Sequence, residues 1–154
     1  MHLHELLEPD DLILDFRPAD KWDAIPRLVE HLAERGRLSK EESPRVEEAV
    51  LQRERSMSTG IEHGIAVPHA AVEGLEELVA CMAVVGNENG LSFESIDGRP
   101  TRLIVLLAIP PAQKLLHIRT LGDVARVLGK ESVRDALLAA STSEEAWSVL
   151  RENS

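Results

Sequence analysis

The chain has 154 residues, the size of one ordinary domain, and 44% of them are hydrophobic, as in a globular protein. Asp and Glu outnumber Lys and Arg by 27 to 17. The resulting net charge of −10 disfavours binding to nucleic acid or to an anionic membrane, because phosphates would be repelled. The single cysteine, Cys81, excludes an internal disulfide and a cysteine-rich metal site.

We expect a cytoplasmic protein with no direct membrane insertion. No apolar run in the sequence approaches the roughly 20 residues that span a bilayer. The acidic N-terminal segment, residues 1–11, has no signal-peptide pattern.

The first predicted helix has apolar residues at helical spacing, namely Trp22, Ile25, Leu28, Val29 and Leu32. Gly36 supplies the signal for its end. Pro26 is tolerable only in the first turn of a helix, so we expect this helix to begin near Asp23.

A second helix is predicted to begin at Ser43 as N-cap, with Pro44 as its first residue. A capping box of Ser39 with Glu42 is the alternative, but it would place Pro44 inside the helix. One face of this helix carries Val46, Ala49, Val50 and Arg53. An arginine on a buried face either extends its charged end to water or meets an anion.

Two continuous apolar runs, Leu78–Val85 and Leu103–Ile109, follow. They do not alternate with polar residues, so they predict strands that are covered on both faces. Asn89-Gly90 and Asp97-Gly98 indicate turns between them.

Helices are predicted near residues 112–128, after Pro110-Pro111, and near 131–140 and 143–151. The alternation of helices and strands indicates an α/β fold in which a small sheet is flanked by helices. With no repeat or long linker, residues 1–154 are interpreted as a single domain.

Residues 53–70, RERSMSTGIEHGIAVPHA, are the segment most informative about chemistry. Gly60 and Gly64 enclose a loop that can adopt positive φ. A short apolar strand follows and ends at Pro68, so we expect His69 at the end of that strand. Side chains at strand ends of α/β folds commonly reach a functional crevice.

A neutral imidazole can accept a phosphoryl group without a general base, because one ring nitrogen has a free lone pair. An arginine is the natural partner for the added charge, since its planar group matches phosphate oxygens. His117 shares a helical stripe with Leu121, Val124 and Leu128, so it also faces inward. Near the start of a helix it is disfavoured as a cation, but it can donate one N–H to a phosphate or to His69.

Structural interpretations of these residues remain open from the pattern alone. His69 is also consistent with a hydrogen-bonded histidine at a strand end, and His117 with a histidine at the edge of the core. Thr59 either caps a turn or contacts phosphate, and Glu54 is expected to form a structural ion pair. Together with His63, the two histidines suggest a metal site, but no Asp, Glu or Cys lies at a supporting spacing, so we predict none.

The run Gly-Ile-Ala-Val-Pro-His-Ala at residues 64–70 resembles the active-site signature of the type-2 EIIA domains of the bacterial sugar phosphotransferase system. This is the fructose/mannitol class, which includes the nitrogen-regulatory EIIA proteins. The resemblance covers nearly the whole chain and extends to Arg53-Glu54, Ser58-Thr59-Gly60, Asp97-Gly98, Pro110 and His117 to Leu121. Ala70 stands where many members have Gly, and Pro26 and Pro44 are unusual for the family's first two helices.

The resemblance implies a mixed sheet sandwiched by helices and a phosphoryl carrier that needs no cofactor or metal. By position, His69 would be the phosphorylated histidine, Arg53 would steady the phosphoryl group, and His117 would be the second active-site histidine. Backbone N–H groups near Thr59 and Gly60 would hold phosphoryl oxygens. The donor would be the phosphocarrier protein HPr or a paralogue of it.

The resemblance leaves the output of the phosphoryl group open. A nitrogen-regulatory role is favoured, because the sequence shows no fused EIIB or EIIC segment. The alternatives are a sugar-specific EIIA that donates to an EIIB domain, and a regulatory module that binds partners without catalysis.

Overall fold

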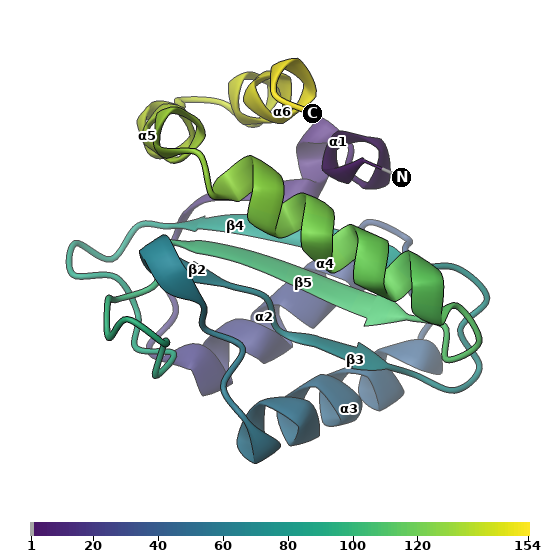
Figure 1. Cartoon of the computed structure of the whole chain (residues 1–154). Coiled ribbons are helices and arrows are strands. Elements are labelled where there is room, and N and C mark those ends of the chain that lie inside the picture. The colour runs from purple at the N-terminus through teal and green to yellow at the C-terminus, as the bar shows by residue number, and fades with distance from the viewer. Residues whose placement is uncertain (1) are drawn as a thin grey trace.

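The computed structural model describes residues 2–154 and shows a mixed sheet between two layers of helices (Figure 1). The helices within this range are α1 (Leu3–Leu6), α2 (Lys21–Glu34), α3 (Glu42–Ser56), α4 (Lys114–Leu128), α5 (Glu131–Ala139) and α6 (Ser143–Glu152). The strands are β1 (Leu12–Phe16), β2 (Ile65–Ala66), β3 (His69–Ala71), β4 (Val79–Val85) and β5 (Leu103–Ile109). Short 3-10 turns lie at Pro9–Asp11 and Glu62–Gly64. The fold is therefore the expected α/β sandwich.

The sheet has the order β1-β4-β5-β2. β3 also pairs with β5, further along that strand than β2 does. β4 and β5 are antiparallel, whereas the other pairs are parallel. Both central strands lie where the apolar runs predicted them, and all of β5 is buried. A strand covered on both faces needs apolar side chains at every position, which is why these runs do not alternate.

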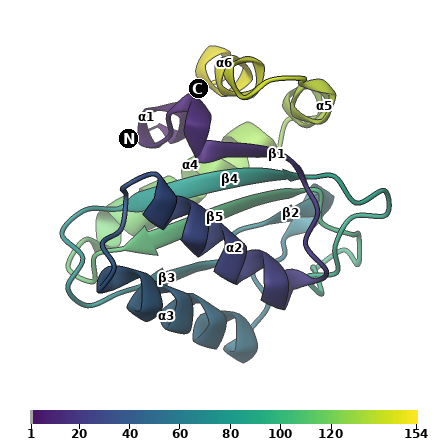
Figure 2. The ribbon, with the colours of Figure 1, turned by 180° about the vertical axis from the view of Figure 1, so that it is seen from behind.

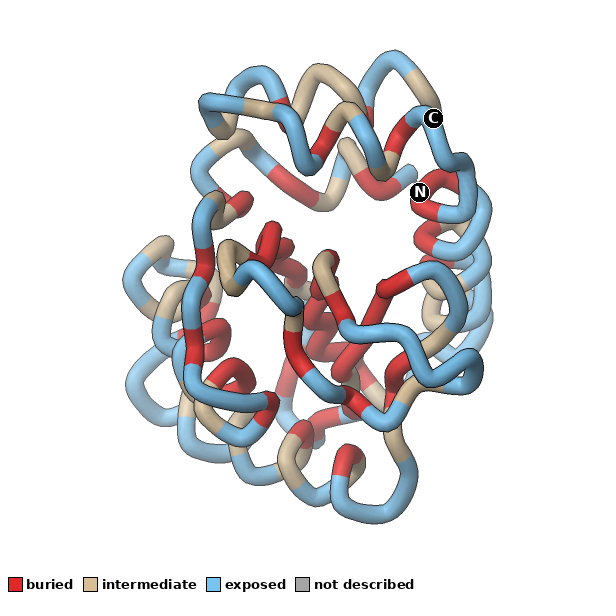
Figure 3. Tube along the Cα trace, turned by 90° about the vertical axis from the view of Figure 1, so that its left-hand side faces the viewer, coloured by how far each residue is buried: buried red, intermediate tan, exposed pale blue. Residues whose placement is uncertain are grey.

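Helices cover each face of the sheet and enclose a separate core. α2 and α3 lie on one face, as Figure 2 shows, and pack on alternate residues of β4 and β5 such as Cys81 and Leu106. α4 covers the other face, with α1, α5 and α6 gathered beside it and in contact with Met82 and Val105. The buried stretches of the chain therefore concentrate between the layers (Figure 3).

α2 begins earlier than the position of its proline suggested. Asp20 is the N-cap, and its side chain accepts the backbone N–H of Asp23 at 2.9 Å. The helix therefore starts at Lys21 rather than near Asp23, and Pro26 lies inside it. The apolar stripe offsets the hydrogen bond that Pro26 cannot donate, because Ile25 and Leu28 are fully buried.

α3 uses the capping box that the prediction had ranked second. The backbone N–H of Ser39 donates to the Glu42 side chain at 2.8 Å, and the Glu42 N–H donates to Ser39 Oγ at 3.1 Å. The helix starts at Glu42, so the predicted start at Ser43 is wrong. Pro44 then interrupts the first helical bonds, as expected for this box: the Ser43 N–H donates to the Ser39 carbonyl oxygen at 3.0 Å, and Pro44 cannot make the next such bond, to Lys40.

The predicted short strand is split into β2 and β3 by Pro68, and His69 opens β3 instead of closing the first strand. Both pieces pair in parallel with β5, with His69 opposite Leu107. The three C-terminal helices lie close to their expected ranges. Over residues 2–154, no helix has the length and apolar character that a membrane crossing requires.

Candidate functional site at His69, His117 and Arg53

Three elements bring the predicted residues to one place. β3 starts with His69, α4 carries His117 in its first turns, and α3 carries Arg53 in its last turn. The two imidazole rings meet edge to face, with centroids 5.2 Å apart and planes at 65°. The charge of Arg53 lowers the pKa of both histidines, so its guanidinium lies within electrostatic reach of both rings.

The imidazole of His69 is oriented by the backbone just before it. Its Nδ1 lies 2.7 Å from the carbonyl oxygen of Val67. A carbonyl oxygen only accepts hydrogen bonds, so Nδ1 carries the proton and Nε2 keeps a free lone pair. Burial lowers the pKa of His69, the Val67 bond opposes this effect, and the charges of Arg53 and His117 lower the pKa further. The ring is therefore neutral near pH 7, with Nε2 as its nucleophilic atom.

His117 is half-buried beside this ring. Burial is the main cause of its lowered pKa, and the charge of Arg53 adds to the effect. Its Nε2 atom is buried and has no hydrogen-bond partner within residues 2–154. A buried polar nitrogen usually has a partner, so this atom is suited to an incoming oxygen atom.

Arg53 is half-buried at the end of α3, and its Nη1 donates to the carbonyl oxygen of Met57 at 2.7 Å. The bond holds the guanidinium against the loop that follows the helix. A guanidinium has five N–H donors, so several remain for an anion.

The two other predicted phosphate contacts, Thr59 and Gly60, have internal partners in this structure. The Thr59 N–H donates to Glu54 Oε2 at 2.9 Å, and its hydroxyl donates to Glu54 Oε1. The Gly60 N–H donates to Ser58 Oγ at 3.0 Å, and the Ser58 hydroxyl donates to the carbonyl oxygen of Phe93. These residues therefore hold the loop next to Arg53 in place.

Glu54 forms the ion pair that the sequence predicted, but with a partner that the sequence did not identify. Lys21 Nζ lies 3.4 Å from Glu54 Oε2, and both residues are buried. They are 33 positions apart, and a lysine in the first turn of a helix normally faces water. A buried acidic residue next to Arg53 was the only local signal for this contact.

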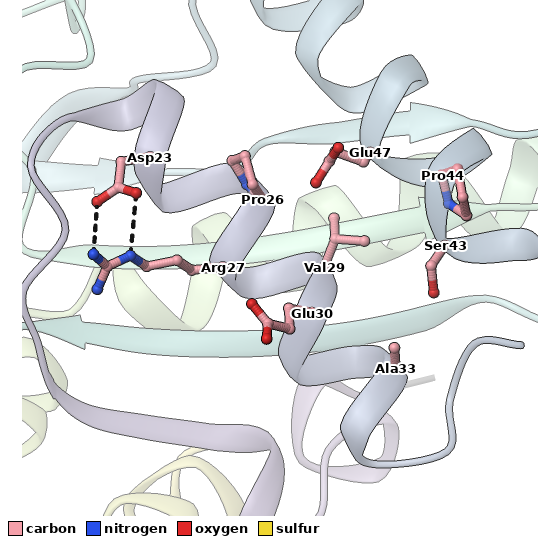
Figure 4. A pocket seen from close by; sticks show the side chains of 9 residues that line it. All are labelled: Asp23, Pro26, Arg27, Val29, Glu30, Ala33, Ser43, Pro44 and Glu47. Carbon is pink, nitrogen blue, oxygen red and sulfur yellow. Dashed lines mark hydrogen bonds and ion pairs between the residues drawn. The ribbon is translucent and has the colours of Figure 1, made fainter. Parts of the chain in front are cut away.

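Two pockets clarify where a ligand or partner can approach. One, of about 290 Å³, lies beside the site and is lined by His117, Ile118 and Pro110 among others. A larger groove of about 620 Å³ runs between α2 and α3 (Figure 4). Its walls include Glu30 and Glu47, and it is separate from the site because neither histidine nor Arg53 lines it.

The alternative metal site does not assemble. His63 lies apart from the histidine pair, with its Nε2 3.8 Å from the Glu62 carboxylate. In the described part of the chain, residues 2–154, no group of three His, Cys, Asp or Glu side chains could hold a metal ion.

Comparisons with known proteins point to one family. A family model described as "Phosphoenolpyruvate-dependent sugar phosphotransferase system, EIIA 2" matches residues 5–153. The PTS system fructose-specific EIIABC component of Bacillus subtilis is 28% identical over 153 residues, which are 99% of this chain and 24% of that relative. The chain thus spans about a quarter of that relative's length.

Solved structures give the same result. The crystal structure of nitrogen regulatory protein IIA-Ntr from Neisseria meningitidis has a TM-score of 0.84 and 25% identity, covering 96% of this chain and 98% of that one. The complex of enzyme IIA mannitol with phosphorylated enzyme IIB mannitol from Escherichia coli shares the fold, with a TM-score of 0.73 and 23% identity over 95% of this chain and 97% of the other.

Proposed function

Because this chain belongs to the type-2 EIIA family of the phosphoenolpyruvate-dependent sugar phosphotransferase system, we propose that it is a phosphoryl carrier, a single domain over residues 1–154 that accepts its phosphoryl group on Nε2 of His69. The observation that carries this proposal is the hydrogen bond from His69 Nδ1–H to the Val67 carbonyl oxygen. It leaves Nε2 as the free nitrogen, beside His117 and within electrostatic reach of Arg53.

The transfer needs little beyond alignment. The bond between phosphorus and the donor's histidine nitrogen breaks as the bond to Nε2 forms, and the donor leaves as an imidazole. The proton on Nδ1 stays on the His69 ring, and the Val67 carbonyl oxygen accepts a hydrogen bond from that N–H. No base therefore has to remove the proton. Arg53 would balance the charge of the phosphoryl group, and His117 would donate Nε2–H to one of its oxygens.

Thr59 and Gly60 support the site in this proposal by holding the loop that Arg53 contacts. Their N–H groups would reach a phosphoryl oxygen only after leaving Glu54 and Ser58. We therefore assign the main phosphoryl contacts to Arg53 rather than to these two residues.

The partners are proposed to be an HPr-type phosphohistidine protein as donor, and an EIIB domain or a regulated protein as acceptor. Support for EIIB comes from the IIA–IIB mannitol complex of the same fold and from the EIIABC name of the Bacillus relative. Exposed apolar side chains near the site offer a contact surface, among them Leu115 and Ile118 on α4. A nitrogen-regulatory role is supported by the structural likeness to IIA-Ntr.

Incubation with phosphoenolpyruvate, enzyme I and HPr tests the proposal. The wild-type protein should gain one acid-labile phosphoryl group, measured by mass spectrometry of the intact protein, because P–N bonds hydrolyse in acid. His69→Ala should gain none, whereas His63→Ala, a change at an exposed histidine six positions away, should be labelled like the wild type. Label on folded His69→Ala would disprove the assignment, and no label on the wild type would favour a module that only binds partners.

The output is decided by offering acceptors to the phosphorylated protein. Release of the label to purified EIIB domains of the fructose/mannitol class would support the sugar-specific alternative. A label that stays on the protein with those domains present would favour regulation through a protein partner.

A further inference from the structure

A buried ion pair joins the start of α2 to the end of α3, immediately next to the proposed site. The Lys21 and Glu54 side chains are 7% and 0% exposed. Removing two charges from water is costly, so such a pair is weak evidence of a stabilising role. The Lys21 ammonium group lies 5.0 Å from the Trp22 ring centroid and 5.7 Å from that of Phe93. The pair is therefore enclosed on the lysine side by aromatic rings.

On the other side, the Glu54 carboxylate accepts both donors of Thr59. The Thr59 N–H reaches Oε2 at 2.9 Å, and the hydroxyl reaches Oε1. Thr59 is itself buried, so Glu54 fixes both its backbone and its side chain. Hydrogen bonds to an ionised acceptor are roughly twice as strong as neutral ones, which suits a carboxylate to this task.

A continuous path of hydrogen bonds runs from this carboxylate to the imidazole. The Thr59 carbonyl oxygen accepts the N–H of Val67 at 3.1 Å, and the Val67 carbonyl oxygen accepts Nδ1–H of His69 at 2.7 Å. Glu54 and His69 are thus joined through the backbones of two residues, Thr59 and Val67. The N–H and C=O of each residue belong to different peptide groups, so the path acts by fixing the position of the Val67 carbonyl oxygen that orients the ring.

We propose that Glu54 is a positioning residue for His69 and that Lys21, paired with its carboxylate, holds that carboxylate in place. Through Thr59 and Val67, the carboxylate holds the ring with its proton on Nδ1 and its lone pair on Nε2. This inference rests on the proposed function, because the nitrogen it frees is the phosphoryl acceptor.

The charges around His69 give the proposal two measurable readouts, the pKa of the ring and the nitrogen that carries its proton. After burial, which lowers the pKa most, Arg53 and His117 lower it further and Glu54 raises it. Glu54→Gln removes a negative charge, so the pKa of His69 should fall. Lys21→Met removes a positive charge, so that pKa should rise. Opposite shifts would show that both charges act on the ring, and the nitrogen that carries the proton then distinguishes positioning from a charge effect through space.

The experiment is NMR of isotope-labelled imidazole nitrogens in the unphosphorylated protein, with a pH titration of His69. The wild type should show neutral His69 protonated at Nδ1, and the two single variants should shift its pKa in opposite directions. The variant Lys21→Met with Glu54→Leu removes both charges and the acceptor, and replacing a buried pair by apolar groups commonly preserves folding. In this double variant neutral His69 should be a mixture of two tautomers, one protonated at Nδ1 and one at Nε2. Phosphoryl transfer from phosphorylated HPr should be slowed by roughly tenfold.

Asp11→Asn is the matched control, because it also alters a buried, ion-paired carboxylate, one that bonds to Arg35 and Arg37 and not to this path. It should retain Nδ1 protonation and transfer within about twofold of the wild type. Three results would overturn the proposal. The first is protonation of neutral His69 at Nε2 in the wild-type protein, a result that does not depend on any variant folding. The others are pKa shifts of His69 that have one sign or are absent in the single variants, and a transfer rate in the double variant equal to that of the wild type. If the titrations behave as expected but the wild type accepts no phosphoryl group, the proposed function fails and the positioning role stands.

Discussion

At the scale of single residues, one backbone carbonyl decides the chemistry of His69. Its sequence context predicted a histidine suited to accept a phosphoryl group but left both ring nitrogens open. In the proposed function the hydrogen bond to Val67 makes Nε2 the acceptor, because Nδ1 is the donor to the carbonyl oxygen. That contact follows from the path of the chain around Pro68, which no pattern of residue types specifies.

The lowered pKa values of His69 and His117 predict how stability depends on pH. Burial is the first cause in both, and it makes each histidine easier to protonate in the unfolded chain, where the reference pKa is 6.5, than in the folded protein. Below that pH the unfolded state binds more protons, so the free energy of unfolding should fall as pH decreases from 6.5. Above pH 6.5 these two residues should contribute no slope.

Urea unfolding at a series of pH values measures this effect. The variant His69→Gln with His117→Gln should have a flatter dependence below pH 6.5, since glutamine does not titrate. The carboxylates whose pKa is lowered, such as Asp11 and Asp123, titrate at more acidic pH and serve as an internal reference. A wild-type stability that rises on acidification through this window would contradict the prediction.

At the scale of elements, the two prolines near helix starts show how context decides the effect of one residue type. Pro44 lies at the start of α3, directly after the Ser43 N–H that donates to the Ser39 carbonyl oxygen, so only the exposed Lys40 carbonyl lacks its helical donor. Pro26 lies beyond the first turn of α2, so the Trp22 carbonyl lacks its usual helical donor. The predicted helix start near Asp23 put Pro26 in the first turn, because that prediction did not include Asp20 as the N-cap.

Pro26→Ala should therefore raise the free energy of unfolding by about 1–2 kcal/mol, because the restored hydrogen bond outweighs the greater freedom of the unfolded chain. Thermal and urea unfolding measure the change. Pro44→Ala is the comparison and should lie within about 0.5 kcal/mol of the wild type, since the bond gained to the Lys40 carbonyl oxygen lies at the exposed end of the helix, where water can already supply a donor. Equal effects of the two changes would show that position in the helix does not explain them.

Most helices and both central strands could be predicted from local patterns. The runs in β4 and β5 are apolar at every position, a signal that depends only on burial. Pairing direction could not be predicted, and neither could the division into β2 and β3, because both depend on contacts with distant segments. The site shows the same limit, since the motif predicted His69 and Arg53 but not the contact between Lys21 and Glu54.

At the scale of the whole molecule, exposed apolar side chains lie beside the site although the surface is strongly acidic. Ile118 follows His117 on α4, is 68% exposed and lines the neighbouring pocket. An exposed side chain of this kind adds nothing to the core, but it can anchor a partner by losing contact with water. The proposed function therefore predicts that a phosphoryl donor covers this residue.

Ile118→Asp should raise the KM for phosphorylated HPr by roughly tenfold, because a charge would be buried in the contact. Steady-state transfer measures it, and thermal unfolding should be unchanged because the side chain is exposed. Ile96→Asp is the matched control: Ile96 is 77% exposed and lines a pocket with Ala125 and Gly129, near the opposite end of α4 from Ile118. If both changes raise KM equally, the effect is one of net charge and not of docking at the site.

The interruption at Pro68 also governs how other molecules can approach. On the outer side of β2, residues 59–61 already pair with backbone groups of residues 65–67. One such bond runs from the Val67 N–H to the Thr59 carbonyl oxygen. Because this edge of the sheet is interrupted and its backbone groups are partly paired, an added peptide strand would find no continuous row of free N–H and C=O groups to pair with. The sheet therefore disfavours the addition of another strand along this edge. In the proposed function, a partner would instead contact the imidazole, guanidinium and aliphatic side chains of the site, and such contacts allow it to dissociate after phosphoryl transfer.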